Sequence, residues 1–152
     1  MAATSGVEAL VGHVRSGDLT SAVRVAAELD LTEFREAMLG EAFDHQSLSC
    51  YGLYVGLLQR GESAELHVAA SEVLSLALNI YPGAYPVAFV HAQRALALEP
   101  DDVSIKEHLL SFHNNPERLL PPAEAARVAG EVLAVDPSNA AGLEVLRRLD
   151  LA

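Results

Sequence analysis

Four residues recur at a fixed offset in the second half of the chain, and they constrain the fold more than any other feature. The two sets lie 37 positions apart and consist of Ala88, Ala92, Ala95, Pro100 and Ala125, Ala129, Val132, Pro137. Spacings of four and three residues put small side chains on one face of a helix, where a second helix can approach closely. The proline then stops the helix. We therefore predict two similar helices, each belonging to a repeated unit.

The rest of the chain also has helical periodicity, without the sustained apolar and polar alternation that indicates strands. Thr32 is the expected N-cap of a third helix, and Gly52 and Gly56 are expected to allow close helix packing in a fourth. We predict an all-α fold of about nine short helices, over residues 5–15, 20–29, 32–43, 46–60, 63–80, 85–98, 102–113, 123–135 and 138–150.

Residues 88–100 and 125–137 resemble the second helix of tetratricopeptide repeats. The resemblance implies one domain over residues 1–152, a right-handed stack of antiparallel helix hairpins (a TPR-like solenoid) capped by its last helix, about residues 138–150. A degenerate unit fits near the N-terminus, where Ala22 and Ala26 fall in its second helix but no proline follows at the expected place. The chain departs from the family in its first helices, because it contains no tryptophan.

Charge and composition exclude several classes of protein. The chain has 152 residues, 51% of them hydrophobic, and its 21 acidic and 10 basic side chains give a net charge of −11, which opposes binding to nucleic acid. The stretch between Glu72 and Arg94 has no charged residue and is long enough for a membrane span, but the turn residues 79–83 break it, so we predict two helices there. One cysteine, Cys50, cannot form an internal disulfide, and no signal peptide is visible, so we expect a cytoplasmic protein.

The sequence offers little support for catalysis, and we expect no enzyme activity, cofactor or metal. Cys50 is interpreted as a buried thiol, since a reactive thiolate needs an electropositive, accessible site. His108 and His113 are five residues apart along a helix, a poor spacing for shared metal coordination. His67 and His91 are interpreted as polar core groups that hydrogen-bond to a neighbouring helix, with a binding-face role as the alternative.

The acidic residues are grouped, which indicates the kind of partner. One group lies early in the chain and another follows the sixth helix: Glu28, Asp30, Glu33, Glu36, Glu41, Asp44, and Glu99, Asp101, Asp102. Each group taken alone is typical of a solvated surface. Together they favour encounter with a basic protein or peptide.

The resemblance also suggests where a partner binds. In tetratricopeptide repeats the first helices line a concave groove, and the positions that correspond to it here are Ala70, Val73, Ala77, Ser104, Glu107, Ser111 and Asn114. Such grooves bind extended or helical peptides. A basic clamp for acidic C-terminal peptides is not evident, so the resemblance does not favour that ligand.

The hypothesis from the sequence is a non-catalytic protein–protein interaction module for a partner with a basic surface. Two alternatives stay open. One is a small acidic immunity or inhibitor protein that neutralises a cognate toxin. The other is a small-molecule sensor or enzyme with a tyrosine-lined pocket, formed near Tyr51, Tyr54, Tyr81 and Tyr85.

Overall fold

The computed structural model describes residues 5–150, which contain α-helices, one π-helical segment and no strand, so the all-α prediction is confirmed. The helices are α1 (Gly6–Ser16), α2 (Leu19–Ala26), α3 (Leu31–His45), α4 (Leu48–Arg60), α5 (Ala64–Glu72), the π-helix η1 (Val73–Ala77), α6 (Ala84–Leu98), α7 (Val103–Asn114), α8 (Pro122–Val135) and α9 (Ala140–Asp150). No helix in this part of the chain is long and apolar enough to cross a membrane.

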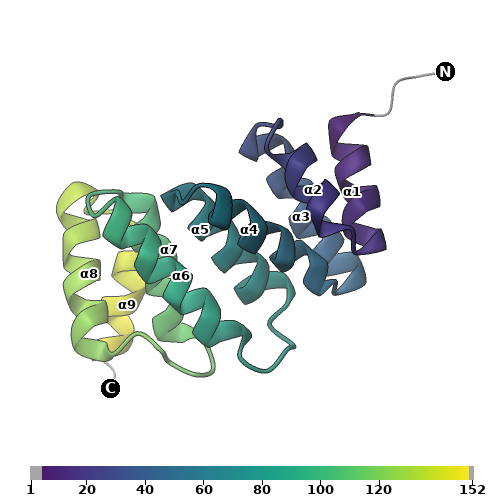
Figure 1. Cartoon of the computed structure of the whole chain (residues 1–152). Helices are drawn as coiled ribbons and strands as arrows, with labels where there is room; N and C mark the ends of the chain where they lie inside the picture. Colours follow the sequence, from purple (N-terminus) through teal and green to yellow (C-terminus); the bar gives the residue numbers. More distant parts are fainter. Residues whose placement is uncertain (1–4, 151–152) are drawn as a thin grey trace.

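The helices pack mainly against their neighbours in the sequence. The most extensive contacts are those of α5 with α6, α1 with α2, α8 with α9, and α7 with α8, while α1 also contacts α3, α3 contacts α5, and α7 contacts α9. The chain therefore progresses from α1 at one end of the molecule to α8 and α9 at the other (Figure 1). Residues that share a surface here come from helices close together in the chain.

Helix starts follow from side chains that satisfy the free N–H groups of the first turn. The N-cap of α3 is Asp30 and not Thr32, which corrects our prediction. The Asp30 carboxylate accepts from the backbone N–H of Thr32 at 2.8 Å, and the Glu33 carboxylate accepts from that of Asp30 at 3.1 Å. This reciprocal capping box needs an acid three residues after the cap, as Glu33 is after Asp30.

The fifth helix is shorter than the predicted span to Ile80. Its α-helical part ends at Glu72, and the chain continues as the π-helix η1 to Ala77. The Leu78 N–H donates to the Val73 carbonyl at 2.9 Å, and the Asn79 side chain donates to the Ser75 carbonyl at 3.0 Å. The amide of Asn79 thus replaces a backbone donor, and the helix ends before it.

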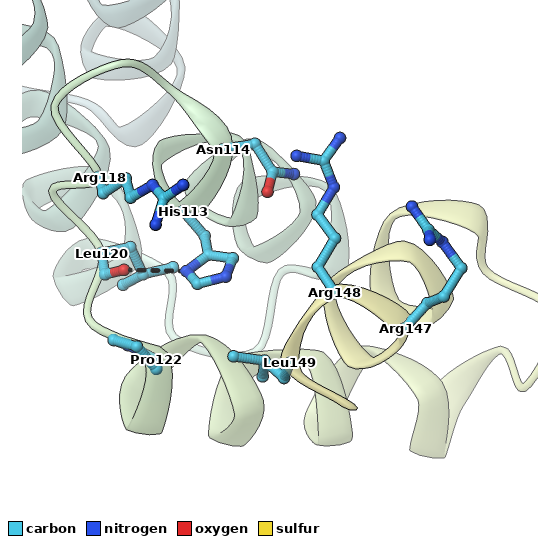
Figure 2. A pocket seen from close by; sticks show the side chains of 8 residues that line it. All are labelled: His113, Asn114, Arg118, Leu120, Pro122, Arg147, Arg148 and Leu149. Carbon is cyan, nitrogen blue, oxygen red and sulfur yellow. Dashed lines mark hydrogen bonds between the residues drawn. The ribbon is translucent and has the colours of Figure 1, made fainter. Parts of the chain in front are cut away.

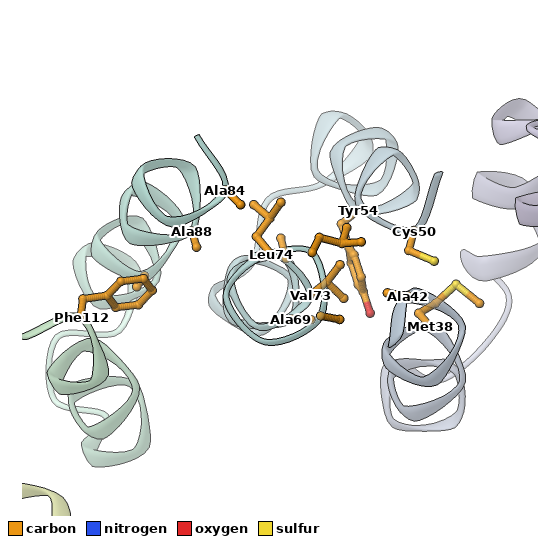
Figure 3. Close-up of a cluster of buried hydrophobic side chains, with 14 of the residues drawn as sticks. Met38, Ala42, Cys50, Tyr54, Ala69, Val73, Leu74, Ala84, Ala88 and Phe112 are labelled. Atoms are coloured by element: carbon orange, nitrogen blue, oxygen red, sulfur yellow. The ribbon is translucent and has the colours of Figure 1, made fainter. Parts of the chain in front are cut away.

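The recurring small residues form the buried faces of α6 and α8, as their spacing predicts. Ala88, Ala92 and Ala95 are fully buried, and so are Ala125, Ala129 and Val132. The buried positions of α4 have the same spacing but larger side chains, Cys50, Tyr54 and Leu57. Figure 3 shows Tyr54 reaching down between α3 and the helix formed by α5 and η1.

Two glycines of α4 allow the close contact with α2 that the sequence predicts. A Cβ atom at Gly52 would lie 2.7 Å from Leu19 Cδ1, and one at Gly56 would lie 2.5 Å from Val23 Cγ2. Both distances are far below an ordinary contact of 3.4–4 Å. The absence of a side chain at these positions therefore sets how closely α2 and α4 pack.

Candidate binding groove

Two adjoining hollows on α3, α5 and the start of α7 form the candidate site, which we call the acidic groove. The first has a volume of about 240 Å³ and includes Glu72, Glu99, Asp102 and His108 in its lining. The second, of about 290 Å³, lies toward α3 and includes Glu36. The two hollows share Arg35 and Glu65, so they form one continuous surface feature.

Negative charge dominates this groove. Its lining carries the five carboxylates of Glu36, Glu65, Glu72, Glu99 and Asp102 and one guanidinium, that of Arg35. Glu36, Glu65 and Glu99 are exposed and have no ion pair within residues 5–150. A cation that enters the groove therefore meets carboxylates without a competing internal partner.

The only arginine in the lining is already engaged. Arg35 donates from Nε to Glu72 Oε2 at 2.9 Å, and its Nη2 donates to the same oxygen. This pair joins α3 to α5 and fixes the position of both side chains. Because both nitrogens use Oε2, the second carboxylate oxygen of Glu72 is left to accept from a ligand.

Asp102 is fixed by its role as the N-cap of α7. Its Oδ1 accepts from the Ser104 hydroxyl at 2.6 Å and from the Ile105 backbone N–H at 3.0 Å. These hydrogen bonds, that from Ser104 foremost, lower the pKa of the Asp102 carboxyl. The carboxylate is consequently ionised and held at the edge of the groove.

His108 contributes a neutral ring to the groove. The buried Ser71 hydroxyl donates to the Ala88 carbonyl at 2.8 Å, so His108 Nε2, 2.7 Å from Ser71 Oγ, must be the donor in that contact. Burial lowers the pKa of the His108 imidazole. In this arrangement the imidazole does not accept the serine proton, so it does not activate Ser71 as a nucleophile.

The predicted groove positions are divided between the core and the surface. Ala70, Val73 and Ala77 belong to the core, with 0%, 1% and 7% of their surface exposed, so the prediction that they line a groove is wrong. The helices packed around α5 and η1 are α3, α4 and α6, and they cover the face that carries these residues. The face left open is the one with Glu65, Val68 and Glu72.

The positions predicted on α7 are separated from one another. Ser104 lines the acidic groove. Glu107 instead accepts from the Asn139 side chain at 2.5 Å, which ties α7 to the start of α9. Ser111 and Asn114 lie in a different hollow, together with Tyr85. The sequence did not predict Arg35, Glu65, Glu72 and His108 as groove residues. The spacing of seven residues between Glu65 and Glu72, which puts them on one helical face, is the pattern that could have indicated these two.

His67 and His91 are polar groups bonded between helices, as predicted. The hydroxyl of Tyr51 lies 3.0 Å from His91 Nε2, the two histidine Nδ1 atoms are 2.8 Å apart, and His67 Nε2 lies 2.8 Å from Glu62 Oε1. One donor direction satisfies every pair: Tyr51 to His91, His91 to His67, and His67 to Glu62. Burial foremost, with the neighbouring His67, lowers the pKa of His91 to about 4, so its ring is neutral at neutral pH.

The cysteine and the tyrosines that the sequence suggested for chemistry do not form a reactive site. Cys50 is fully buried, and burial raises the pKa of its thiol to about 11. The tyrosines do not share one cavity, because Tyr54 is buried, Tyr81 donates to the Gln46 carbonyl at 2.6 Å, and Tyr85 lines the hollow with Ser111. Within residues 5–150, no three histidine, cysteine or acidic side chains are grouped so as to hold a metal ion.

Comparisons with protein-family models, curated proteins and solved structures gave no match to this chain. The functional conclusion therefore depends on the geometry and charge of the groove.

Proposed function

We propose that this protein is a non-catalytic interaction module that binds a basic segment of a partner protein in the acidic groove. The observation that carries the proposal is the lining of the groove, in which five carboxylates surround one arginine that is already paired. Such a surface attracts lysine and arginine side chains and repels acidic ones.

The internal ion pairs of the chain support the proposal. Seven of its ten basic side chains pair with carboxylates: Arg15, Arg35, Arg94, Lys106, Arg127, Arg147 and Arg148. Within residues 5–150 these pairs use six of the 21 carboxylates, so 15 remain outside pairs with lysine or arginine. The negative field outside the molecule therefore comes from carboxylates that no lysine or arginine neutralises, and it accelerates encounter with a basic partner.

The size of the hollows favours side chains of a larger partner over a small molecule. Taken singly, their volumes of about 240 and 290 Å³ lie below the range of roughly 300–1,000 Å³ that is typical of small-molecule pockets. Two small, connected hollows suit successive long side chains of an extended segment. The partner segment that fits best thus carries more than one lysine or arginine.

We also infer that the architecture is a TPR-like stack, in which α1, α3, α5 and α7 are the first helices of four units and α9 is the cap. Three observations support this inference: the helices contact close neighbours in the chain, α1 contacts α3 and α3 contacts α5, and the 37-residue recurrence falls on buried faces. The acidic groove lies on three of these first helices, α3, α5 and α7, but on a different face of α5 from the one that the tetratricopeptide register assigns to the groove.

Binding of a labelled basic peptide tests the proposal. We suggest fluorescence anisotropy with a peptide of alternating arginine and alanine, and with its glutamate counterpart, at ionic strengths of about 0.01 M and about 0.15 M, where the Debye length falls from about 30 Å to about 8 Å. We expect saturable binding of the arginine peptide alone, weakened by salt. Binding of both peptides, or of neither, contradicts the proposal.

A matched pair of variants localises the binding. The groove variant carries Glu36→Gln, Glu65→Gln and Glu99→Gln, and the control carries Glu28→Gln, Asp44→Asn and Glu117→Gln at exposed positions elsewhere. Both lose three negative charges. Three exposed ion pairs at about 0.2–1 kcal/mol each predict a loss of affinity of roughly 3-fold to 150-fold for the groove variant. An equal loss in the control would show that net charge, and not the groove, determines binding.

A further inference from the structure

A second cavity, at the C-terminal end of the molecule, has the opposite charge. It has a volume of about 590 Å³ and lies between the end of α7, the loop to α8, and the end of α9. Figure 2 shows Arg118, Arg148 and His113 around this cavity. We call it the basic pocket and define it by Arg118, Arg147, Arg148 and His113. It gathers three of the ten basic side chains of a chain whose net charge is −11.

The guanidiniums of the basic pocket are only partly neutralised. Glu144 accepts from Arg147 Nε and Nη2, both at 2.8 Å, and from Arg148 Nε at 2.6 Å. One carboxylate thus serves two guanidiniums, whose other N–H groups remain as donors. Arg118 has no ion pair within residues 5–150. The pocket therefore keeps an excess of positive charge and several free donors.

Arg118 occupies an unfavourable backbone conformation, which gives independent support to a role for its side chain. Its φ angle is +46°, in the left-handed region that residues other than glycine and asparagine seldom adopt. The turn is held by the Arg118 N–H, which donates to the Asn115 carbonyl at 3.0 Å. A strained residue beside a cavity is a typical feature of a binding site.

His113 and three apolar side chains complete the pocket. His113 Nδ1 lies 3.2 Å from the Leu120 carbonyl, which can only accept, so Nδ1 carries the proton. Figure 2 shows the other ring nitrogen turned away from Leu120, toward the interior of the pocket. Leu120, Pro122 and Leu149 supply an apolar wall below the charged groups.

We propose that the basic pocket binds the phosphate group of a small organic phosphate. Donors that come from Arg118 on one side and from Arg148 on another suit a tetrahedral phosphate with three acceptor oxygens better than a planar carboxylate with two. Arg147 lies beyond Arg148, where its guanidinium is held by Glu144, and it adds positive charge to the pocket. The volume lies inside the range of roughly 300–1,000 Å³ for small-molecule pockets, so the ligand has a body as well as a charged group. The apolar wall is the surface on which that body packs.

This proposal does not depend on the acidic groove. The groove is formed by α3, α5 and the start of α7, whereas the pocket is formed by the end of α7 with α8 and α9. Their ligands have opposite charge. Failure of one proposal therefore does not contradict the other, because the groove is tested with a basic peptide and the pocket with phenyl phosphate.

Calorimetric titration of the full chain in a buffer free of phosphate tests the pocket with three probes. We expect phenyl phosphate to bind with one site per chain, more tightly than inorganic phosphate because its ring packs on the apolar wall, and more tightly than benzoate because of its charge and geometry. Absence of saturable binding, or equal binding of phenyl phosphate and benzoate, would overturn the proposal.

Two substitutions place the ligand at the charged groups. Arg118→Asn keeps a residue that tolerates the left-handed backbone, and Arg148→Gln changes an exposed side chain, so neither is expected to disturb folding. We expect each to weaken binding of phenyl phosphate about tenfold or more, as removal of a charge-assisted hydrogen bond does. Arg127→Gln, which removes the same charge from an exposed position of α8 outside the pocket, is the control. If it weakens binding as much, the ligand is not held by the pocket.

Discussion

Replacement of Gly56 by alanine tests the close contact between α2 and α4. The new Cβ atom would lie 2.5 Å from Val23 Cγ2, almost 1 Å nearer than the shortest ordinary contact of 3.4 Å. Val23 is β-branched and has few alternative rotamers, so it cannot easily turn aside. At Gly52 the neighbour is the end of the more flexible Leu19 side chain, and the same substitution should be tolerated better.

Two opposing effects determine the magnitude. Alanine in place of glycine inside a helix stabilises by about 1 kcal/mol. Overpacking of a methyl group against a stiff neighbour destabilises by roughly 1–3 kcal/mol, and the severe overlap at Gly56 places it in the upper part of that range. We therefore expect Gly56→Ala to lower the free energy of unfolding by about 1–2 kcal/mol.

The matched control is Gly130→Ala in α8, where a Cβ atom meets nothing within 4 Å. This variant should gain about 0.5–1 kcal/mol from helix propensity alone. Urea unfolding followed by circular dichroism measures the free energy of unfolding of both variants. In thermal unfolding, the midpoints of the two variants should differ by about 4 °C or more in a chain of this size. In a Val23→Ala background Gly56→Ala should become stabilising, because the overlapping methyl is gone. If Gly56→Ala stabilises the unaltered chain as Gly130→Ala does, the close approach of α2 and α4 is wrong.

Two further predictions concern α6. His91 has a pKa of about 4 in the folded chain against 6.5 ordinarily, so the unfolded chain binds its proton first and stability falls as the pH drops from about 6.5 to about 4. The full shift in pKa corresponds to a loss of about 3 kcal/mol in the free energy of unfolding, and because the ring is partly exposed we expect a loss of about 2 kcal/mol. Urea unfolding should therefore depend more steeply on pH in the unaltered chain than in His91→Gln. Ala92→Leu on the buried face should lower the free energy of unfolding by about 1–3 kcal/mol, whereas Ala97→Leu on the exposed face should change it by less than about 0.5 kcal/mol. Equal urea midpoints for these two variants would show that the face carrying Ala92 is not packed.

Most helices could be predicted from the sequence because their boundaries are set by local chemistry. Ser63 and Asp102 cap α5 and α7 through their own side chains, and the proline after α6 excludes a continuation. The misplaced N-cap of α3 follows from the same chemistry, since Asp30 and Thr32 are both good caps and the position of Glu33 decides between them. The end of α5 could not be predicted, because it depends on how Asn79 folds back onto Ser75.

The groove was harder to predict because tertiary packing, and not helix periodicity, decides which face of α5 is open. Ala70, Val73 and Ala77 lie on a proper helical stripe, but so do Glu65 and Glu72. The first stripe is apolar and is covered by α3, α4 and α6. A stripe of alanine and valine is typical of a packed face, and the hydrophobic effect alone favours its burial over its exposure to a groove.

The distribution of the basic residues explains why the acidic groove and the basic pocket differ in charge. Three arginines each join two successive parts of the fold: Arg15 of α1 pairs with Glu41 of α3, Arg35 of α3 with Glu72 of α5, and Arg94 of α6 with the loop residue Glu62. Each of these arginines has a different carboxylate as its partner, so no arginine neutralises the other carboxylates near it.

At the C-terminal end, arginines outnumber the carboxylates with which they pair. Two arginines of α9 share one carboxylate, Glu144, and Arg118 approaches them from the loop before α8. Helix C-termini favour basic side chains, which accounts for Arg147 and Arg148 in the last turn of α9 but not for Arg118, whose backbone is strained. Arg118 is therefore the basic residue of this pocket that helix chemistry does not account for, and the proposed phosphate ligand would give its side chain a partner.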